Sequence, residues 1–145
     1  MIGIDADFYI AYELATHPKH AAARPVLDGL IDSGETIAVC TQVIAEFLHV
    51  VTDANRFTTP LSMAEAVART RQLFSAHEVT LLSPDLAAMN LCLRWMDEFQ
   101  LGRKRVLDTM LAATLLTKGV TKIATMNDKD FRVFRKFDFI SPSAS

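Results

Sequence analysis

The sequence predicts an α/β fold in which helices cover both faces of a central parallel sheet. Short apolar segments alternate with segments of helical periodicity along the chain. The segment TIAVC (36–40) is almost wholly apolar, which is typical of a strand buried on both faces. With 145 residues, 50% of them hydrophobic, the chain can bury one core, so we expect a single domain over 1–145. Alternation of this kind forms a parallel sheet with right-handed crossovers.

The first half of the chain supplies strands and helices in turn. In order these are a strand at 2–4, helices at 8–14 and 20–30, a strand at 36–40, and helices at 41–54 and 62–77. The first helix ends before the His17-Pro18 step, because a residue that precedes proline avoids helical backbone angles. The second helix ends at Ser33-Gly34, a common stop signal.

The last helix of this half begins at Ser62 with a capping box. The Ser62 hydroxyl can accept a hydrogen bond from the amide of Glu65, three residues on. Met63, Val67 and Phe74 share one face of the helix. Apolar faces at helical spacing usually pack on a core, which is the prediction here, and a protein partner is the alternative.

The second half of the chain continues the alternation. It contains a strand at 79–82, helices at 83–99 and 108–118, a strand at 122–126, a short helix at 128–134 and a last strand at 137–140. Ser83-Pro84 opens the first of these helices, because proline is favoured at the first helical position. Gly119 ends the second. In such sheets, ligands bind beyond the carboxyl ends of the strands.

The composition argues against several classes of protein. No apolar run approaches the roughly 20 residues that a membrane span needs, and no secretory leader is evident. Cys40 and Cys92 lie among apolar neighbours and are predicted to be small buried side chains, which fits a cytoplasmic setting. The four histidines lack zinc-ligand spacing, and five glycines form no phosphate-binding loop.

Positive charge gathers late in a chain whose net charge is only −2. The cluster comprises Arg103, Lys104, Arg105, Lys118, Lys122, Lys129, Arg132, Arg135 and Lys136. Two interpretations remain open: an ordinary solvated face, or an electrostatic footprint for nucleic acid.

Acidic and amide side chains follow the predicted strands or begin the helices after them. Asp5 follows the first strand, Glu46 lies near the start of the helix after the second, Asp108 opens a helix, and Asn127 and Asp130 follow the fourth strand. Each has a local explanation as a cap or turn residue. Together they converge at one edge of a parallel sheet, where crowded carboxylates need a divalent cation.

Four segments resemble the PIN-domain family, and within it the VapC-type toxin ribonucleases. They are IDADFYIAYE around Asp5, TQVIAEFLHV around Glu46, GRKRVLDTMLAATLLTKGV around Asp108 and KIATMNDKDF. The resemblance covers nearly the whole chain and implies a Rossmann-like three-layer α/β/α sandwich. It also implies an endoribonuclease that depends on Mg²⁺ or Mn²⁺.

The resemblance assigns Asp5, Glu46 and Asp108 to the metal and the catalytic site. The fourth acid of the family falls at Asn127, which can ligate but brings no charge, so Asp130 or Asp128 would contribute. Asp7 stands where relatives often carry Asn; we expect it to face solvent or to cap the first helix, adding negative charge.

The resemblance also implies the substrate and the partners. Single-stranded or looped RNA would be cut, with its backbone drawn to Arg103, Lys104 and Arg105. A small antitoxin protein and a homodimer are expected, and no membrane. Two alternatives stay open: a related nuclease that processes RNA or DNA, and a non-catalytic nucleic-acid-binding module that has lost activity through Asn127.

Overall fold

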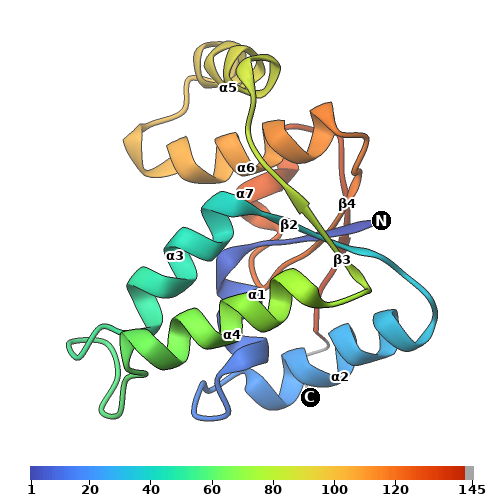
Figure 1. The fold of residues 1–145 in the computed structure, drawn as a ribbon. Coiled ribbons are helices and arrows are strands. Elements are labelled where there is room, and N and C mark those ends of the chain that lie inside the picture. The colour runs from blue at the N-terminus through green and yellow to red at the C-terminus, as the bar shows by residue number, and fades with distance from the viewer. Residues whose placement is uncertain (143–145) are drawn as a thin grey trace.

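A computed structural model describes residues 1–142 and has the predicted three-layer α/β/α architecture (Figure 1). The elements in chain order are β1 (Ile2–Ile4), α1 (Ala6–Glu13), α2 (His20–Asp32), β2 (Ile37–Cys40), α3 (Thr41–Val51), α4 (Met63–Ser75), β3 (Val79–Leu82), α5 (Leu86–Glu98), the 3₁₀ turn η1 (Arg103–Arg105), α6 (Val106–Thr117), β4 (Lys122–Ala124), α7 (Lys129–Arg132) and β5 (Asp138–Ile140).

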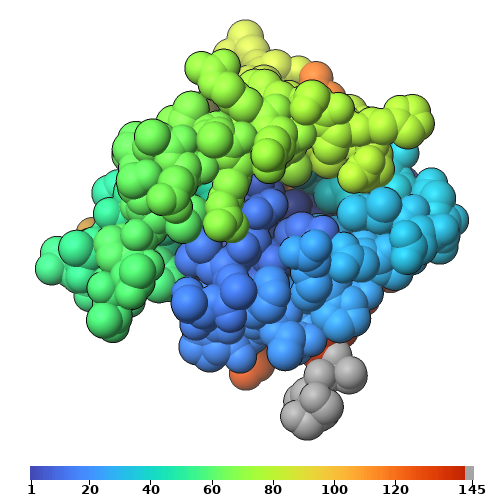
Figure 2. All heavy atoms as spheres, turned by 60° about the horizontal axis from the view of Figure 1, so that its bottom comes forward, coloured from blue at the N-terminus to red at the C-terminus, as the bar shows by residue number. Residues whose placement is uncertain are grey.

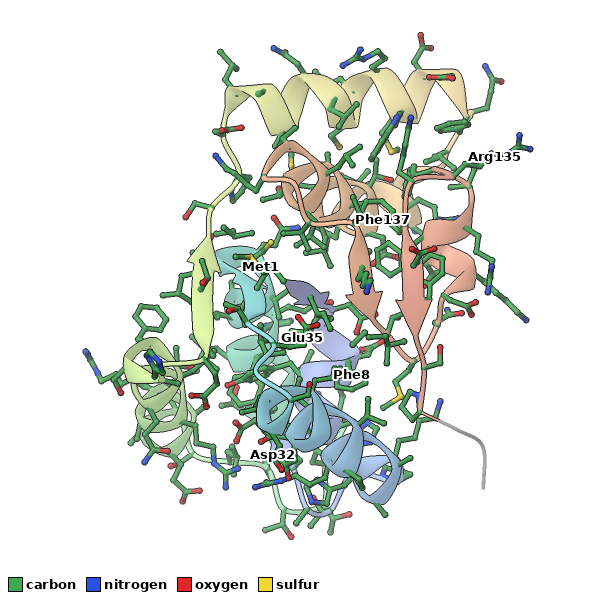
Figure 3. All side chains as sticks on the ribbon, turned by 90° about the vertical axis from the view of Figure 1, so that its right-hand side faces the viewer. Met1, Phe8, Asp32, Glu35, Arg135 and Phe137 are labelled. Carbon is green, nitrogen blue, oxygen red and sulfur yellow. The ribbon has the colours of Figure 1, made fainter. Side chains whose placement is uncertain are left out.

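The central sheet has five parallel strands in the order β3-β2-β1-β4-β5. Figure 3 shows β3 at one edge and β5 at the other. From β1 the chain builds outward to β2 and β3 on one side, then returns to place β4 and β5 on the other. The strand order therefore reverses between β1 and β4, and ligands of such sheets bind at this reversal, beyond the carboxyl ends.

Helices cover both faces of the sheet. In Figure 1, α5 and α6 lie on one face, and α1, α2 and α4 lie on the other. Helix α5 packs on α6 and is outermost (Figure 3). A Cβ atom at Gly3 would come 2.7 Å from a terminal methyl group of Leu115, so the Leu115 side chain packs directly on the backbone of β1.

The interior is apolar and aromatic, as the composition predicts. Tyr9 meets Phe47 edge to face, with ring centroids 4.7 Å apart, and this contact fixes α1 against α3. On the other face, Trp95 of α5 stacks on Phe134 at 4.5 Å. Both cysteines are buried free thiols, as predicted. Within residues 1–142, every helix is too short or too polar to cross a membrane.

Several helices begin at residues other than those that the sequence predicts, among them α6, which begins at Val106 and not at Asp108. Helix α1 begins at Ala6 instead of Phe8, and its cap is Asp5, not Asp7. Helix α5 begins at Leu86, because the Asp85 side chain accepts a hydrogen bond from the Ala88 amide at 2.9 Å and so serves as its cap. An aspartate cap stabilises a helix start directly, and this outweighs the preference of proline for the first turn.

Helix α4 confirms one prediction and contradicts another. The Ser62 hydroxyl accepts from the Glu65 amide at 3.1 Å, as the capping box predicts. The prediction that the face with Met63 and Phe74 packs inward is wrong, since these side chains are 53% and 55% exposed. The buried stripe instead contains Ala66 and Thr70, whose small side chains let the helix approach its neighbours closely.

Candidate active site

A cleft of about 540 Å³ lies at the carboxyl edge of the sheet. It is bordered by the residues that follow β1, by α3, and by η1 with the start of α6. Helix α3 and the start of α6 stand on the left of Figure 1, beyond the strands. Five carboxylates line the cleft, namely Asp5, Asp7, Glu46, Asp108 and Asp130. Of the predicted site residues, only Asn127 and two of the three basic ones do not line it.

Asp5 is tied down by two hydrogen bonds in the floor of the cleft. It is the N-cap of α1, and one carboxylate oxygen accepts from the Phe8 amide at 2.9 Å. The other oxygen accepts from the Thr125 hydroxyl. Thr125 follows β4 and itself accepts from the Asn127 amide at 3.0 Å. These bonds connect the ends of β1 and β4 where the strand order reverses, so the cap is also part of the cleft.

The environment of Asp5 favours its neutral form. The side chain is 8% exposed. Burial raises its pKa to about 7, although the hydrogen bonds from Thr125 and Phe8 act in the opposite direction. The charges of Asp7 and Asp108 raise it further. A cation in the cleft would relieve both the burial of the charge and the repulsion.

Asp108 stands on the opposite wall, in the first turn of α6. Burial is the main cause that raises its pKa to about 6, followed by the charge of Asp130; Arg105 opposes the shift. Glu46 and Asp7 also raise it. Because each of these effects is electrostatic and falls with distance, the acids of both walls share one local field.

Glu46 lies at the rim of the cleft, on the second turn of α3. Its surface is largely exposed, yet the walls of the cleft restrict water around the carboxylate, and this desolvation raises its pKa. Asp7 raises the pKa as well, whereas Arg56 and His49 lower it. Glu46 therefore lies within reach of both acidic and basic side chains of the cleft.

Asn127 and Asp130 occupy different places. Asp130 lines the cleft, whereas Asn127 stands behind it and donates from its side-chain amide to Asp130 Oδ2 at 2.9 Å. Asp128 pairs with Arg132 instead. Asp130 is therefore the acid that the segment after β4 contributes to the cleft, and the Asn127 side chain supports it.

The three basic residues that were predicted to contact RNA lie in different surroundings. Lys104 lines the cleft, and Arg103 is exposed outside its lining. Arg105 donates from its guanidinium to the backbone carbonyl of Asp130, which ties η1 to α7. Arg105 therefore acts within the protein, by holding Asp130 and lowering the pKa of Asp108.

Sequence reasoning missed several residues of the site. Thr125 lay within the predicted strand at 122–126 and was given no role. Gln42, His49 and Arg56 also line the cleft. The spacing of Gln42, Glu46 and His49 along α3 gives them one face, which was a usable signal. Arg56 belongs to a loop, and no periodicity indicates it.

The carboxylate oxygens are the donors that Mg²⁺ and Mn²⁺ prefer. Within residues 1–142, no three His, Cys, Asp or Glu side chains already lie close enough to hold one ion together. Mg²⁺ is usually bound by one or two carboxylates, several waters and substrate phosphates, so it does not need such a cage. The donor set and the raised pKa values fit a divalent cation of this kind.

A narrower groove of about 170 Å³ lies between α4 and the pair α1 and α2. Figure 2 shows it as a hollow between the green-yellow and blue parts of the surface. Leu27 and Leu73 line it, and Arg69 pairs with Glu13 at 3.5 Å beside it. The groove is mainly apolar and contains no cluster of acids, so its chemistry suits packing against another molecule.

The family model described as "PIN domain" matches residues 2–137. Among curated proteins, the chain is similar to "Ribonuclease VapC31" of Mycobacterium tuberculosis, with 26% identity over 142 residues, 98% of this chain and 99% of the relative. It is also similar to "Ribonuclease VapC24" of the same organism, with 28% identity over 134 residues, 92% of this chain and 91% of the relative.

Solved structures support the same fold. The crystal structure of Mycobacterium tuberculosis VapC20, described as a sarcin-ricin loop cleaving toxin, matches with a TM-score of 0.70 and 14% identity over 92% of this chain and 95% of that one. A chain of VapBC2 from Rickettsia felis, bound to a DNA fragment from its promoter, matches with a TM-score of 0.68 and 16% identity over 97% and 98%.

Proposed function

The chain belongs to the PIN-domain family, and we propose that it is a divalent-metal-dependent endoribonuclease, the toxin of a toxin–antitoxin pair. The observation that carries the proposal is the convergence of five carboxylates in one cleft at the reversal of strand order. Two of them, Asp5 and Asp108, have raised pKa values of about 7 and about 6. Such a field repels a lone phosphodiester and attracts a divalent cation.

Asp5 and Asp108 would hold Mg²⁺ or Mn²⁺, with Glu46 binding directly or through water. When bound, the ion would polarise the scissile phosphate and make water a better nucleophile. Thr125 keeps the Asp5 carboxylate in one orientation, as partners behind metal ligands commonly do. Asp130, supported by Asn127, accepts a hydrogen bond from the attacking water.

The RNA substrate is supported by the ribonuclease names of the curated relatives. Lys104 provides a phosphate contact on the wall of the cleft, and Arg103 extends this positive region over the surface. Arg105 is not proposed as an RNA contact, because its guanidinium donates to the backbone carbonyl of Asp130.

The partner is a small antitoxin protein, and the chain forms a homodimer. Solved complexes of similar fold support an antitoxin, among them a toxin–antitoxin complex from Klebsiella pneumoniae with a TM-score of 0.64. The apolar groove beside α4 and the exposed Met63 and Phe74 offer the surfaces that a protein partner covers. Growth arrest on induced expression, relieved by the neighbouring small gene, tests the toxin role.

The nuclease is tested with Asp108→Asn and single-stranded RNA. The variant keeps the size and most of the shape of the side chain but removes its charge, so we expect a folded protein without Mg²⁺-dependent cleavage. Circular dichroism checks the fold, and gel analysis of the RNA gives the rate. If Asp108→Asn cleaves at the wild-type, Mg²⁺-dependent rate, the assignment is wrong.

A further inference from the structure

We propose that the cleft continues past Arg56 into a second hollow, which holds a nucleotide flanking the scissile bond, and that Arg56 binds a phosphate of that nucleotide. The inference rests on the proposed ribonuclease function and adds a substrate subsite to it. Arg56 is the residue that lines both the cleft and the second hollow.

The hollow has a volume of about 280 Å³. It lies between two connections, the segment 14–19 that joins α1 to α2 and the segment 52–62 that joins α3 to α4. This volume is close to the lower end of small-ligand pockets, which span about 300–1,000 Å³. A volume of this size suits a single nucleotide unit.

The lining of the hollow differs from that of the cleft. It presents the hydroxyl groups of Thr16, Thr58 and Thr59 beside the apolar surfaces of Pro18 and Phe57. None of the described residues that line it is acidic. Hydroxyl groups donate and accept hydrogen bonds, which suits a ribose, and the apolar surfaces suit the face of a base.

The connection that carries Arg56 is held by its own backbone. The Asp53 carbonyl accepts from the amides of Arg56 and Phe57, both at 3.1 Å. The Asp53 side chain accepts from the Asn55 amide at 2.8 Å. The Leu61 amide donates to the Val51 carbonyl at 2.9 Å and closes the connection. The position of Arg56 is thus set before any ligand arrives.

The Arg56 side chain is available to a phosphate. The side chain is 59% exposed, and its guanidinium pairs with Asp53 at 3.4 Å. Exposed pairs of this kind contribute little, so exchange of the carboxylate for a phosphate costs little. Arg56 lines the acidic cleft, and its charge lowers the pKa of Glu46 there. A planar fork of donors is the group that best matches a phosphate.

The positions of Lys104 and Arg56 offset the repulsion between the acidic cleft and the RNA backbone. The acids of the cleft repel the RNA backbone on both sides of the scissile bond, wherever the cation does not neutralise them. Lys104 of η1 and Arg56 of the connection between α3 and α4 both line the cleft. In the proposed complex these two cations hold the strand against the acids and so define its path.

The test compares Arg56→Gln with Arg24→Gln. Arg24 is a matched control, because it is also exposed and paired with one aspartate, Asp28 at 3.0 Å, but it borders neither hollow. Both changes are made in Asp108→Asn protein, which binds without cutting. Fluorescence anisotropy with labelled single-stranded RNA at several salt concentrations gives the dissociation constant and its salt dependence.

We expect Arg56→Gln to weaken RNA binding about fivefold and to reduce the slope of log K against log salt by about 0.7, the value for one phosphate contact on a single strand. Arg24→Gln leaves both unchanged. Removal of the terminal nucleotide that would occupy the second hollow should weaken RNA binding to protein that retains Arg56. The same removal should have little further effect on the Arg56→Gln variant.

The outcomes separate the two proposals. If Arg56→Gln binds RNA with the affinity and salt slope of Arg24→Gln, the subsite is wrong, and wild-type cleavage still supports the nuclease. If wild-type protein fails to cut RNA with Mg²⁺, the nuclease is wrong, while the anisotropy result decides whether Arg56 contacts RNA. Loss of affinity without a change in slope also overturns the phosphate contact.

Discussion

Helices α1 and α5 begin in the same way, yet their capping aspartates have opposite electrostatics. Asp5 accepts from the Phe8 amide and Asp85 from the Ala88 amide, each at 2.9 Å. The Lys118 side chain donates a hydrogen bond to the exposed Asp85 carboxylate. This bond, together with the one from the Ala88 amide, lowers the pKa of Asp85. Burial raises the pKa of Asp5 to about 7. A cap is therefore a local role, and the surroundings decide whether it also carries chemistry.

The largest expected difference between the two caps is in RNA cleavage. We expect Asp5→Asn to lower the initial rate at saturating Mg²⁺ by at least about a thousandfold, because it removes a charged metal ligand from the cleft. Asp85→Asn removes the charge of a similar cap outside the cleft lining, and it should stay within about twofold of wild type. Equal losses in the two variants would mean that the charge of a helix cap, and not metal binding, explains the effect.

The second difference is in the pH dependence of stability without metal. The folded protein holds the Asp5 proton more tightly than the unfolded chain, because the pKa is raised from 3.8 to about 7. Its contribution to the free energy of unfolding is complete below pH 3.8 and is lost as the pH rises through 7. The loss is up to about 4 kcal/mol, at about 1.4 kcal/mol per pH unit.

Urea denaturation in EDTA between pH 4 and 8 measures this loss. We expect Asp5→Asn to make the decline shallower, since an amide does not titrate, while the raised pKa of Asp108 preserves part of it. The contribution of Asp85 to the free energy of unfolding depends on pH in the opposite direction. Because its pKa is lowered, this contribution is present above pH 3.8 and is lost in acid. Asp85→Asn should therefore leave the decline toward pH 8 intact. A wild-type protein that is equally stable at pH 5 and pH 8 would contradict the buried environment of Asp5.

The smallest expected effect concerns the bond that distinguishes Asp5 from Asp85. Thr125→Val removes the hydroxyl that donates to Asp5 but retains the shape of the side chain. Since that bond lowers the pKa of Asp5, its loss should shift Mn²⁺ binding to higher pH. We also expect a 10- to 100-fold weaker affinity, the usual cost of losing a partner of a metal ligand.

Calorimetric titration with Mn²⁺ at several pH values measures both changes. Thr117→Val is the matched control, because the Thr117 hydroxyl bonds only to the backbone of α6. An unaltered affinity and pH profile in Thr125→Val would leave Thr125 without a positioning role.

The alternation of strands and helices was predictable because each element follows from local rules. Apolar runs and helical spacing extend over a few turns, and stop signals such as Ser33-Gly34 act on neighbouring backbone. The start of α5 was missed because Pro84 and Asp85 are both favoured near helix starts, at positions that imply different boundaries. The orientation of α4 was missed because it depends on which face fits the sheet.

Within the site, the acids were predictable and their supports were not. Asp5, Glu46, Asp108 and Asp130 follow strands or begin helices, and the rule for parallel sheets brings them to one edge. Lys104 and Arg105 are adjacent in sequence, yet one lines the cleft and the other binds the Asp130 carbonyl. Consecutive residues of a helical turn point in different directions, and only packing selects which direction is inward.

By itself, the sequence determined the elements, their order and the carboxylates at the sheet edge, because periodicity and caps act between neighbours. Only the tertiary structure decided the chemistry of those carboxylates. The bond between Thr125 and Asp5 joins residues 120 positions apart, and burial that depends on the whole fold raises the pKa of Asp5 to about 7. Desolvation and repulsion depend on distances in space, which no local pattern fixes.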